Sequence, residues 1–269
     1  MDIRDYLIKR LIEAKISSPR LEADVLLKHF VKNFPHISKS EEENIKNALE
    51  RRVNSEPLDK IIEKKGFYKF DFKVNSDVLT PRPDTEILVE EALTFIDDNK
   101  EYKIADLGTG SGCILLSLLK ERNNLRGIGV DISTKALEVA CYNAKMLDVL
   151  DRVTFLYLSW NDLFYKDEEF DFIVSNPPYI PYKEFLELEK GVKNFDPEIA
   201  LVGGEDGLVC YREISIIAQK ILKKNGYIFL EVGYNQAIEV ADIFRLQGFE
   251  LVKISKDLAD INRCVILKK

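Results

Sequence analysis

The sequence contains only two histidines, His29 and His36, and both lie near the start of its 269 residues. The rest of the chain therefore has no imidazole with which to build a catalytic triad or a histidine metal site. Its cysteines are widely spaced and form no Cys-x-x-Cys pair; they are Cys113, Cys141, Cys210 and Cys264. This spacing favours reduced thiols in a cytoplasmic protein over zinc ligands or disulfides, so we expect no metal.

The sequence also lacks long apolar stretches and an excess of basic over acidic residues. No stretch is apolar enough to span a bilayer, and the first residues, MDIRDYLIKR, are charged rather than signal-like. We therefore expect a cytoplasmic protein without a membrane partner. Lys and Arg number 39 against 46 Asp and Glu, and the acidic excess falls after residue 65. Because phosphate neutralisation supplies most of the affinity of duplex-binding proteins, we expect no direct nucleic-acid partner.

Residues 1–65 have the pattern of a small helical domain. Apolar residues recur at three- and four-residue spacing in RDYLIKRLIEA. Ser18 and Pro19 provide a cap and a first turn for a second helix, RLEADVLLKHFV. A third helix is expected after Ser40, which precedes Glu43 at the spacing of a capping box.

The period changes at residues 66–80, where FYKFDFKVNSDVLT alternates apolar and polar side chains. With Asn75 and Ser76 as turn residues, this segment predicts a β-hairpin linker. Residues 81–269 then alternate between helix and strand patterns. The seven strand patterns are KIADLG, RGIGVDIS, VTFLYLSW, FDFIVSN, GYIFLEVG, FELVKIS and RCVILKK. Their order predicts an α/β domain with a mostly parallel, doubly wound sheet.

The first of these strands runs into a glycine-rich turn, Gly108 to Gly112. Glycines let the backbone approach a ligand, and the amides at the start of the following helix can face it. The second strand ends in Asp131, about twenty residues further on, where a carboxylate can accept hydrogen bonds from ribose hydroxyls. Trp160 ends the third strand, where packing and contact with an adenine are both plausible. Together these residues predict an adenosine-type ligand.

The fourth strand leads into Asn176, Pro177, Pro178 and Tyr179, the most specific motif of the chain. Two prolines remove two amide donors and fix the backbone. The Asn176 side-chain oxygen and the Pro177 carbonyl can accept the two hydrogens of one NH₂ group. The Tyr179 ring can pack on a planar group. The motif predicts methylation of an amide or amino nitrogen, in which alignment supplies most of the catalysis.

These motifs resemble class I, Rossmann-like methyltransferases of the Asn-Pro-Pro-Tyr type. The segments SPRLEADVLL, VLTPRPDTEILVE, FDPEIALVGGEDGL and DLADINRCVI are similar to the peptide chain release factor glutamine methyltransferases, the PrmC/HemK family. The similarity covers nearly the whole chain. It implies methyl transfer from S-adenosylmethionine, with S-adenosylhomocysteine as product. The acceptor it implies is the side-chain amide of the glutamine in the GGQ motif of class I release factors.

The resemblance also implies roles for individual residues. The implied cofactor contacts are Gly108, Thr109, Gly110, Ser111, Gly112, Asp131, Trp160 and Asn176. The implied catalytic residues are Asn176, Pro177 and Tyr179. The implied substrate contacts are Arg82, Pro83, Asn176, Pro177, Pro178 and Tyr179, with Arg82 to Glu86 walling the pocket. Related ribosomal-protein glutamine methyltransferases typically carry an Arg-Ser-Pro-Ile-like sequence there, which favours release factors.

The chain departs from the family pattern at the junction of its two parts. Where relatives usually read Glu-Pro-Leu-x-Tyr-x-x-Gly, it has Lys60 and Glu63 in place of the tyrosine and the glycine. Alternative functions are adenine-N6 methylation of nucleic acid, which suits the same motif, and methylation of another translation protein. A third alternative is a non-catalytic module that binds the cofactor. The intact Asn-Pro-Pro-Tyr motif argues against it. The N-terminal helices serve either to dock the protein substrate or simply to stabilise the catalytic domain.

Overall fold

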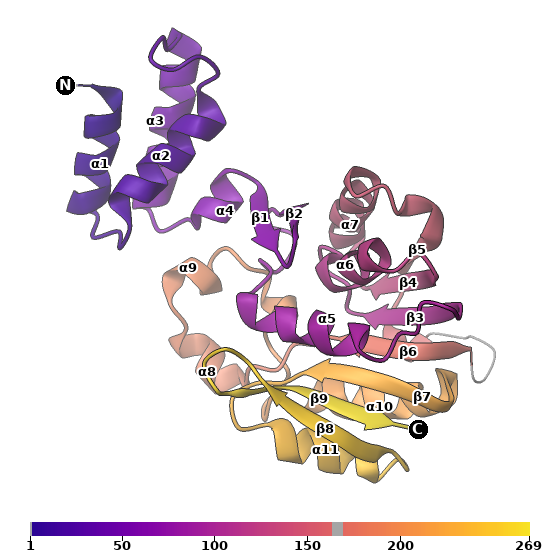
Figure 1. Cartoon of the computed structure of the whole chain (residues 1–269). Coiled ribbons are helices and arrows are strands. Elements are labelled where there is room, and N and C mark those ends of the chain that lie inside the picture. The colour runs from indigo at the N-terminus through magenta and orange to yellow at the C-terminus, as the bar shows by residue number, and fades with distance from the viewer. Residues whose placement is uncertain (1, 163–168) are drawn as a thin grey trace.

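The computed structural model describes residues 2–162 and 169–269. Four helices come first and lie beside the rest of the molecule (Figure 1). They are α1 (Ile3–Glu13), α2 (Pro19–Phe30), α3 (Lys39–Val53) and the short α4 (Leu58–Ile61). Their apolar faces enclose a core of their own, which includes Leu11, Leu26 and Leu49.

Helix caps follow the sequence in one case and differ in another. Ser18 precedes α2 with Pro19 in the first turn, as predicted. The capping box of α3, however, is formed by Ser38 and Glu41, two residues earlier than the predicted pair. Glu41 also accepts the backbone N–H of Lys32 at 2.9 Å. The pairs Ser38/Glu41 and Ser40/Glu43 have the same spacing in the sequence. The contact between Glu41 and Lys32, which the sequence does not reveal, distinguishes the first pair from the second.

A two-stranded hairpin joins the helices to the large sheet. Its strands are β1 (Lys64–Phe67) and β2 (Phe70–Lys73), which pair antiparallel. The turn is made by Tyr68 and Lys69, and Tyr68 has a φ of 55°. Asn75 and Ser76, predicted as turn residues, instead follow the second strand. A tyrosine in the left-handed region gives no turn signal, so the sequence predicted a hairpin but misplaced its turn.

The large sheet confirms the predicted fold class. Its order is β5-β4-β3-β6-β7-β9-β8, and only β9 runs antiparallel to its neighbours. The strands are β3 (Tyr102–Leu107), β4 (Leu125–Asp131), β5 (Val153–Tyr157), β6 (Phe170–Ser175), β7 (Leu222–Glu231), β8 (Glu250–Lys256) and β9 (Asn262–Lys268). Their interiors are apolar and buried because helices cover both faces.

The helices of this part form two layers (Figure 1). One layer contains α5 (Glu86–Leu93), α6 (Cys113–Glu121) and α7 (Thr134–Met146). The other contains α10 (Val209–Ile221) and α11 (Ala237–Arg245). The loops hold α8 (Tyr182–Glu187), α9 (Lys190–Lys193) and the 3-10 turns η1 (Pro83–Thr85), η2 (Leu150–Arg152), η3 (Trp160–Asp162) and η4 (Glu198–Ala200).

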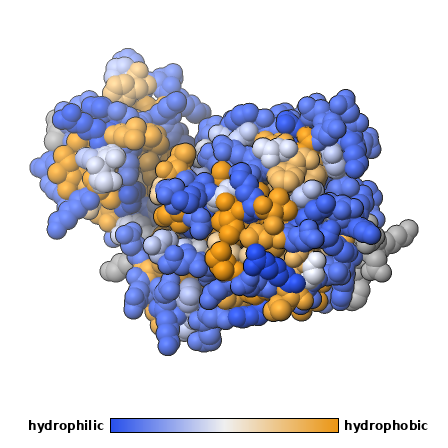
Figure 2. Space-filling view, turned by 60° about the horizontal axis from the view of Figure 1, so that its bottom comes forward, coloured by the Kyte–Doolittle hydropathy of each residue, from blue (hydrophilic) through white to orange (hydrophobic). Residues whose placement is uncertain are grey.

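The strand order places a crevice at the centre of the sheet. From β3 the chain moves outward through β4 to β5, and it then returns to the other side of β3 with β6. Ligands of such sheets bind outside the carboxyl ends of the strands at this reversal. The surface in Figure 2 shows apolar side chains gathered in the middle of one face, surrounded by hydrophilic ones. Within the described ranges, no helix has the length and apolar character that crossing a membrane would need.

Candidate active site

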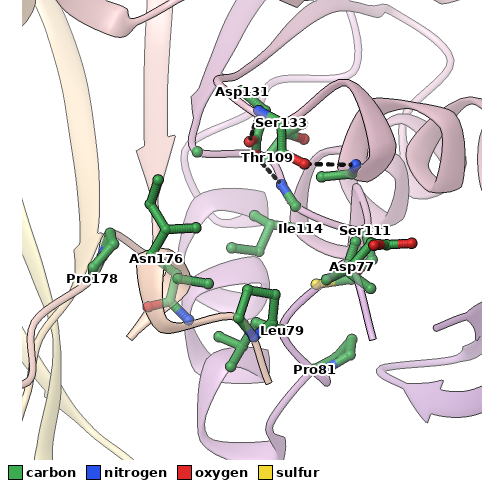
Figure 3. Close-up of a pocket in the computed structure, with 18 of the residues that line it drawn as sticks. Asp77, Leu79, Pro81, Thr109, Ser111, Ile114, Asp131, Ser133, Asn176 and Pro178 are labelled. Carbon is green, nitrogen blue, oxygen red and sulfur yellow. Dashed lines mark hydrogen bonds between the residues drawn. The ribbon is translucent and has the colours of Figure 1, made fainter. Parts of the chain in front are cut away.

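A cavity of about 250 Å³ lies at the carboxyl ends of β3, β4 and β6. Five segments contribute most of its lining: the glycine loop after β3, the end of β4, the segment after β6, and two loops formed by residues 76–82 and 197–200. In Figure 3, Asp131 and Asn176 lie on different sides of the cavity with Ile114 between them. The cavity therefore joins the predicted cofactor residues to the predicted Asn-Pro-Pro-Tyr site.

The glycine loop leaves open space in front of its backbone. Gly110 has a φ of 55°, in the left-handed region, and a Cβ built on it would meet no atom within 4 Å. Gly108 faces the Trp160 ring, whose Cζ3 would lie 3.4 Å from such a Cβ. Thr109 and Ser111 also line the cavity. Gly112 lies outside the lining and forms the N-cap of α6.

Two acidic side chains lie at the loop. Asp131 accepts the backbone N–H groups of Gly110 and Ser133, both at 2.9 Å, and burial raises its pKa. Ser133, not Asp131, caps α7. Asp106 accepts the Thr109 hydroxyl at 2.7 Å, and its Oδ1 is buried with no hydrogen-bond partner among the described residues. Burial raises the pKa of Asp106 to about 7.

These residues fit S-adenosylmethionine. The carboxylate of Asp131 retains lone pairs for ribose hydroxyls, and the open space above Gly110 accommodates a ligand close to the backbone. Exposed Ile132 supplies apolar surface for a planar base. Trp160 lines the same space, and its Nε1 donates to Glu213 Oε2 at 2.9 Å. Negative charge near the loop suits a cofactor that carries a sulfonium and an amino group.

The segment after β6 presents unused acceptors. Asn176 lines the cavity, and its Nδ2 donates to the Thr85 hydroxyl at 3.3 Å. Within the part of the chain that the structure describes, no group donates a hydrogen bond to Asn176 Oδ1 or to the Pro177 carbonyl. Pro178 lines the cavity beside Asn176, whereas Pro177 is buried and outside the lining. Asn176 Oδ1 is therefore unpaired at the cavity, whereas the role of the Pro177 carbonyl as a second acceptor stays a prediction.

Another loop supports this segment from behind. Ile180 accepts the backbone N–H of Gly203 at 3.0 Å and donates its own N–H to Leu201 at 2.9 Å. A Cβ on Gly203 would lie 2.5 Å from the Pro178 carbonyl oxygen, so only glycine permits this approach. The FDPEIALVGG segment thus fixes the position of the Asn-Pro-Pro-Tyr backbone.

Tyr179 lies outside the cavity lining. Its hydroxyl donates to Glu231 Oε1 at 3.4 Å, and its backbone carbonyl accepts Gln236 Nε2 at 3.0 Å. Burial raises the pKa of its phenol. Glu231 is itself buried, its Oε2 has no partner among the described residues, and burial raises its pKa to about 7. In this arrangement Tyr179 contributes to the backbone position, and the ring contact predicted for it stays a prediction.

Thr85 belongs to the segment from Arg82 to Glu86 that was predicted to wall the pocket, but no contact of its own was predicted from the sequence. It lies in η1, is 2% exposed, and lines the cavity. Its hydroxyl accepts the Asn176 amide and also lowers the pKa of Glu231 through hydrogen bonding. Because the Thr85 hydroxyl accepts from Asn176 Nδ2, the NH₂ of Asn176 faces Thr85 and Oδ1 is left as the free atom. The place of Thr85 in the wall segment was the signal in the sequence, and its contact with Asn176 was not predicted.

Arg82 and Pro83 differ in their relation to the cavity. Arg82 lines it and pairs with Asp196, Nη2 to Oδ2 at 2.8 Å. Pro83 is exposed, begins η1 and lies outside the lining. In residues 2–162 and 169–269 no group of His, Cys, Asp and Glu side chains is arranged to hold a metal ion.

Comparison with known proteins identifies the family. A family model described as a methyltransferase domain matches residues 98–261. The release factor glutamine methyltransferase of Caulobacter vibrioides is 39% identical to this chain and aligns over 96% of it and 92% of the relative. This chain belongs to the release factor glutamine methyltransferase family. It is therefore an S-adenosylmethionine-dependent methyltransferase, as its motifs predicted.

Two further comparisons place this methyltransferase. The bifunctional methyltransferase of Rickettsia prowazekii is 38% identical over 95% of this chain, which spans only 54% of that longer relative. The crystal structure of a methyltransferase from Pyrococcus furiosus has a TM-score of 0.55 at 15% identity, covering 83% of this chain and 98% of that one. The second likeness concerns the fold alone, and it agrees with the predicted class I methyltransferase sheet.

Proposed function

We propose that this methyltransferase methylates the side-chain amide nitrogen of the glutamine in the GGQ motif of class I release factors. One observation carries the proposal: Asn176 lines a cavity that fits the cofactor, and its Oδ1 has no hydrogen-bond donor among the described residues. When bound, S-adenosylmethionine supplies an electrophilic methyl group. The relatives named release factor glutamine methyltransferase support glutamine as the acceptor.

The chain's own residues act mainly by orientation. An amide nitrogen is a poor nucleophile because its lone pair is delocalised over the carbonyl. Two acceptors that hold both N–H bonds, at Asn176 and Pro177, favour a geometry in which the lone pair is exposed. Alignment of this kind can supply much of a rate enhancement without a proton-transfer residue. The apolar cavity wall, including Leu79 and Ile199, excludes water from the aligned group.

Adenine-N6 methylation remains the second candidate because an exocyclic amine also presents two hydrogens. The lining of the described cavity contains a single basic side chain, Arg82, which gives little attraction for phosphates. The lack of a nucleic-acid partner and the cytoplasmic location stay predictions.

The test of function offers labelled S-adenosylmethionine together with a purified release factor, or with DNA, and locates the label by peptide mass spectrometry. We expect label on the GGQ glutamine and none on DNA. Label on DNA alone would replace the proposal with adenine methylation. Label on neither, with normal cofactor binding, would point to another protein substrate.

Thr85→Val should lower kcat about three- to tenfold, the effect of one lost hydrogen bond, because valine keeps the shape but cannot orient Asn176. Thr85→Ser retains the hydroxyl and should recover most of the rate. Steady-state kinetics with the release factor measure both, and calorimetry should show unchanged cofactor affinity. Equal activity of the valine and serine variants would remove Thr85 from the argument.

We also propose the division into a docking unit (1–65), a linker (66–80) and a catalytic unit (81–269). The separate apolar core of the first four helices supports an independent unit. Deleting residues 1–54 retains α4 and should raise the KM for release factor about tenfold or more, since a docking surface is lost. Cofactor affinity, measured by calorimetry, should be unchanged. Loss of cofactor binding as well would indicate a stabilising role instead.

A further inference from the structure

Lys60 is a buried lysine at the junction between the helices and the sheet. It lies on α4 and is only 3% exposed. Its Nζ donates to the backbone carbonyls of Asn75 at 2.6 Å and Val78 at 2.5 Å, and it lies 2.9 Å from Asp196 Oδ1. Burial lowers the pKa of Lys60, while the carboxylate of Asp196 raises it. The residue is thus tied to two segments that are far apart in the sequence.

Asp196 divides its two oxygens between two cations. Oδ1 accepts Lys60 Nζ and also the backbone N–H and hydroxyl of Thr80, both at 3.2 Å. Oδ2 accepts Arg82 Nη2 at 2.8 Å. Arg82 therefore pairs through one nitrogen only, although guanidinium and carboxylate groups often pair through two parallel hydrogen bonds. Two positive charges share one negative charge, so a net positive charge remains.

Of the two cations, Arg82 lies at the cavity. Val78 and Arg82 line it from one of the joined segments, and Pro197 and Ile199 line it from the other. Lys60 itself is outside the lining. In the described ranges, Nε and Nη1 of Arg82 make no hydrogen bond. Arg82, 40% exposed in its side chain, thus has unused donors at the cavity.

We propose that Lys60 is a positioning residue for the binding of the protein substrate. Lys60 binds Asp196 Oδ1, and this keeps the free donors of Arg82 available for a backbone carbonyl of the substrate beside the reacting glutamine. The inference rests on the proposed function, since it needs a peptide in the cavity. Without Lys60, only the two longer hydrogen bonds from Thr80, both 3.2 Å, hold Asp196 Oδ1, and Arg82 can compete with them to bind the carboxylate through both oxygens. The guanidinium then turns away from the cavity and its charge is neutralised.

The test compares Lys60→Met with wild type in the full-length chain. Methionine keeps an unbranched stem but removes the charge. We expect the KM for release factor to rise about tenfold, while kcat and cofactor affinity change by less than about twofold. Lys64→Met, at an exposed lysine of β1, is the matched control and should change none of the three. An unchanged KM in Lys60→Met would overturn the proposal.

A double mutant separates this role from simple stabilisation. Arg82→Ala should raise the KM to a similar degree, and adding Lys60→Met should then change it by no more than about twofold, because Lys60 acts through Arg82. If the double mutant instead raised the KM by the product of the two single effects, the proposal would be overturned.

If Lys60→Met does not fold, Lys60→Gln, which retains donors for the two carbonyls, gives the same comparison. Wild-type protein that methylates no release factor would refute the proposed function and the inference together. If the wild-type protein methylates the release factor but the effects of Lys60→Met and Arg82→Ala on KM multiply in the double mutant, the inference alone would be refuted.

Discussion

Asn176→Ala should lower the kcat of methyl transfer by about a hundredfold or more, the size of effect seen when one oriented transition-state contact is removed. Asn176 lines the cavity and its Oδ1 has no donor among the described residues, so alanine would leave one hydrogen of the substrate NH₂ without a partner. The lone pair then stays delocalised. Single-turnover kinetics with labelled cofactor and release factor measure the rate of the chemical step.

The matched control is Asn47→Ala, at an exposed position of α3, which should leave kcat unchanged. Asn176→Asp is informative because it keeps an oxygen but loses the N–H that donates to Thr85. We expect it to be impaired as well, since the orientation of the side chain is lost. Should Asn176→Ala retain more than about a tenth of the rate, the acceptor pair would not be the source of catalysis.

Asp196→Ala should destabilise the protein by about 3–5 kcal/mol, the usual cost of leaving a buried charge without its partner. The Asp196 carboxylate is 3% exposed and holds both Lys60 and Arg82. After its removal the Lys60 ammonium retains only two backbone carbonyls. Urea-induced unfolding followed by circular dichroism measures the free energy of unfolding.

Asp98→Ala is the control, since Asp98 is 76% exposed in its pair with Arg122 and such pairs contribute about 0–1 kcal/mol. The double variant Lys60→Met/Asp196→Ala should be more stable than Asp196→Ala, because the uncompensated charge is gone. A loss for Asp196→Ala no larger than that for Asp98→Ala would show that the buried pair contributes little.

The sequence predicted the architecture well because strand patterns and loop motifs are local. All seven strands lie where apolar runs predicted them, and the glycine loop and Asn-Pro-Pro-Tyr segment follow the strands expected. Asp131 and Asn176 line one cavity for the same reason, since the carboxyl ends of parallel strands meet at one edge.

The remaining site residues depend on partners that local patterns do not reveal. Lys60 stood out only as a departure from the family pattern, and nothing near it in the sequence indicates that Asp196 is its partner. Thr85 lies within the predicted wall segment but had no predicted contact, and Glu231 carries no motif; their roles follow from their hydrogen bonds with Asn176 and Tyr179. Residues such as these become identifiable only when the chain is folded.

The contact between Thr80 and Asp196 joins positions 116 residues apart, and this separation bears on the order in which the site is assembled. Closing so long a loop costs entropy that local contacts do not, so such pairs tend to form late in folding. During synthesis the glycine loop and Asp131 leave the ribosome well before Asp196. The cofactor half of the cavity can therefore be ordered on a nascent chain while the wall that faces the substrate is still open.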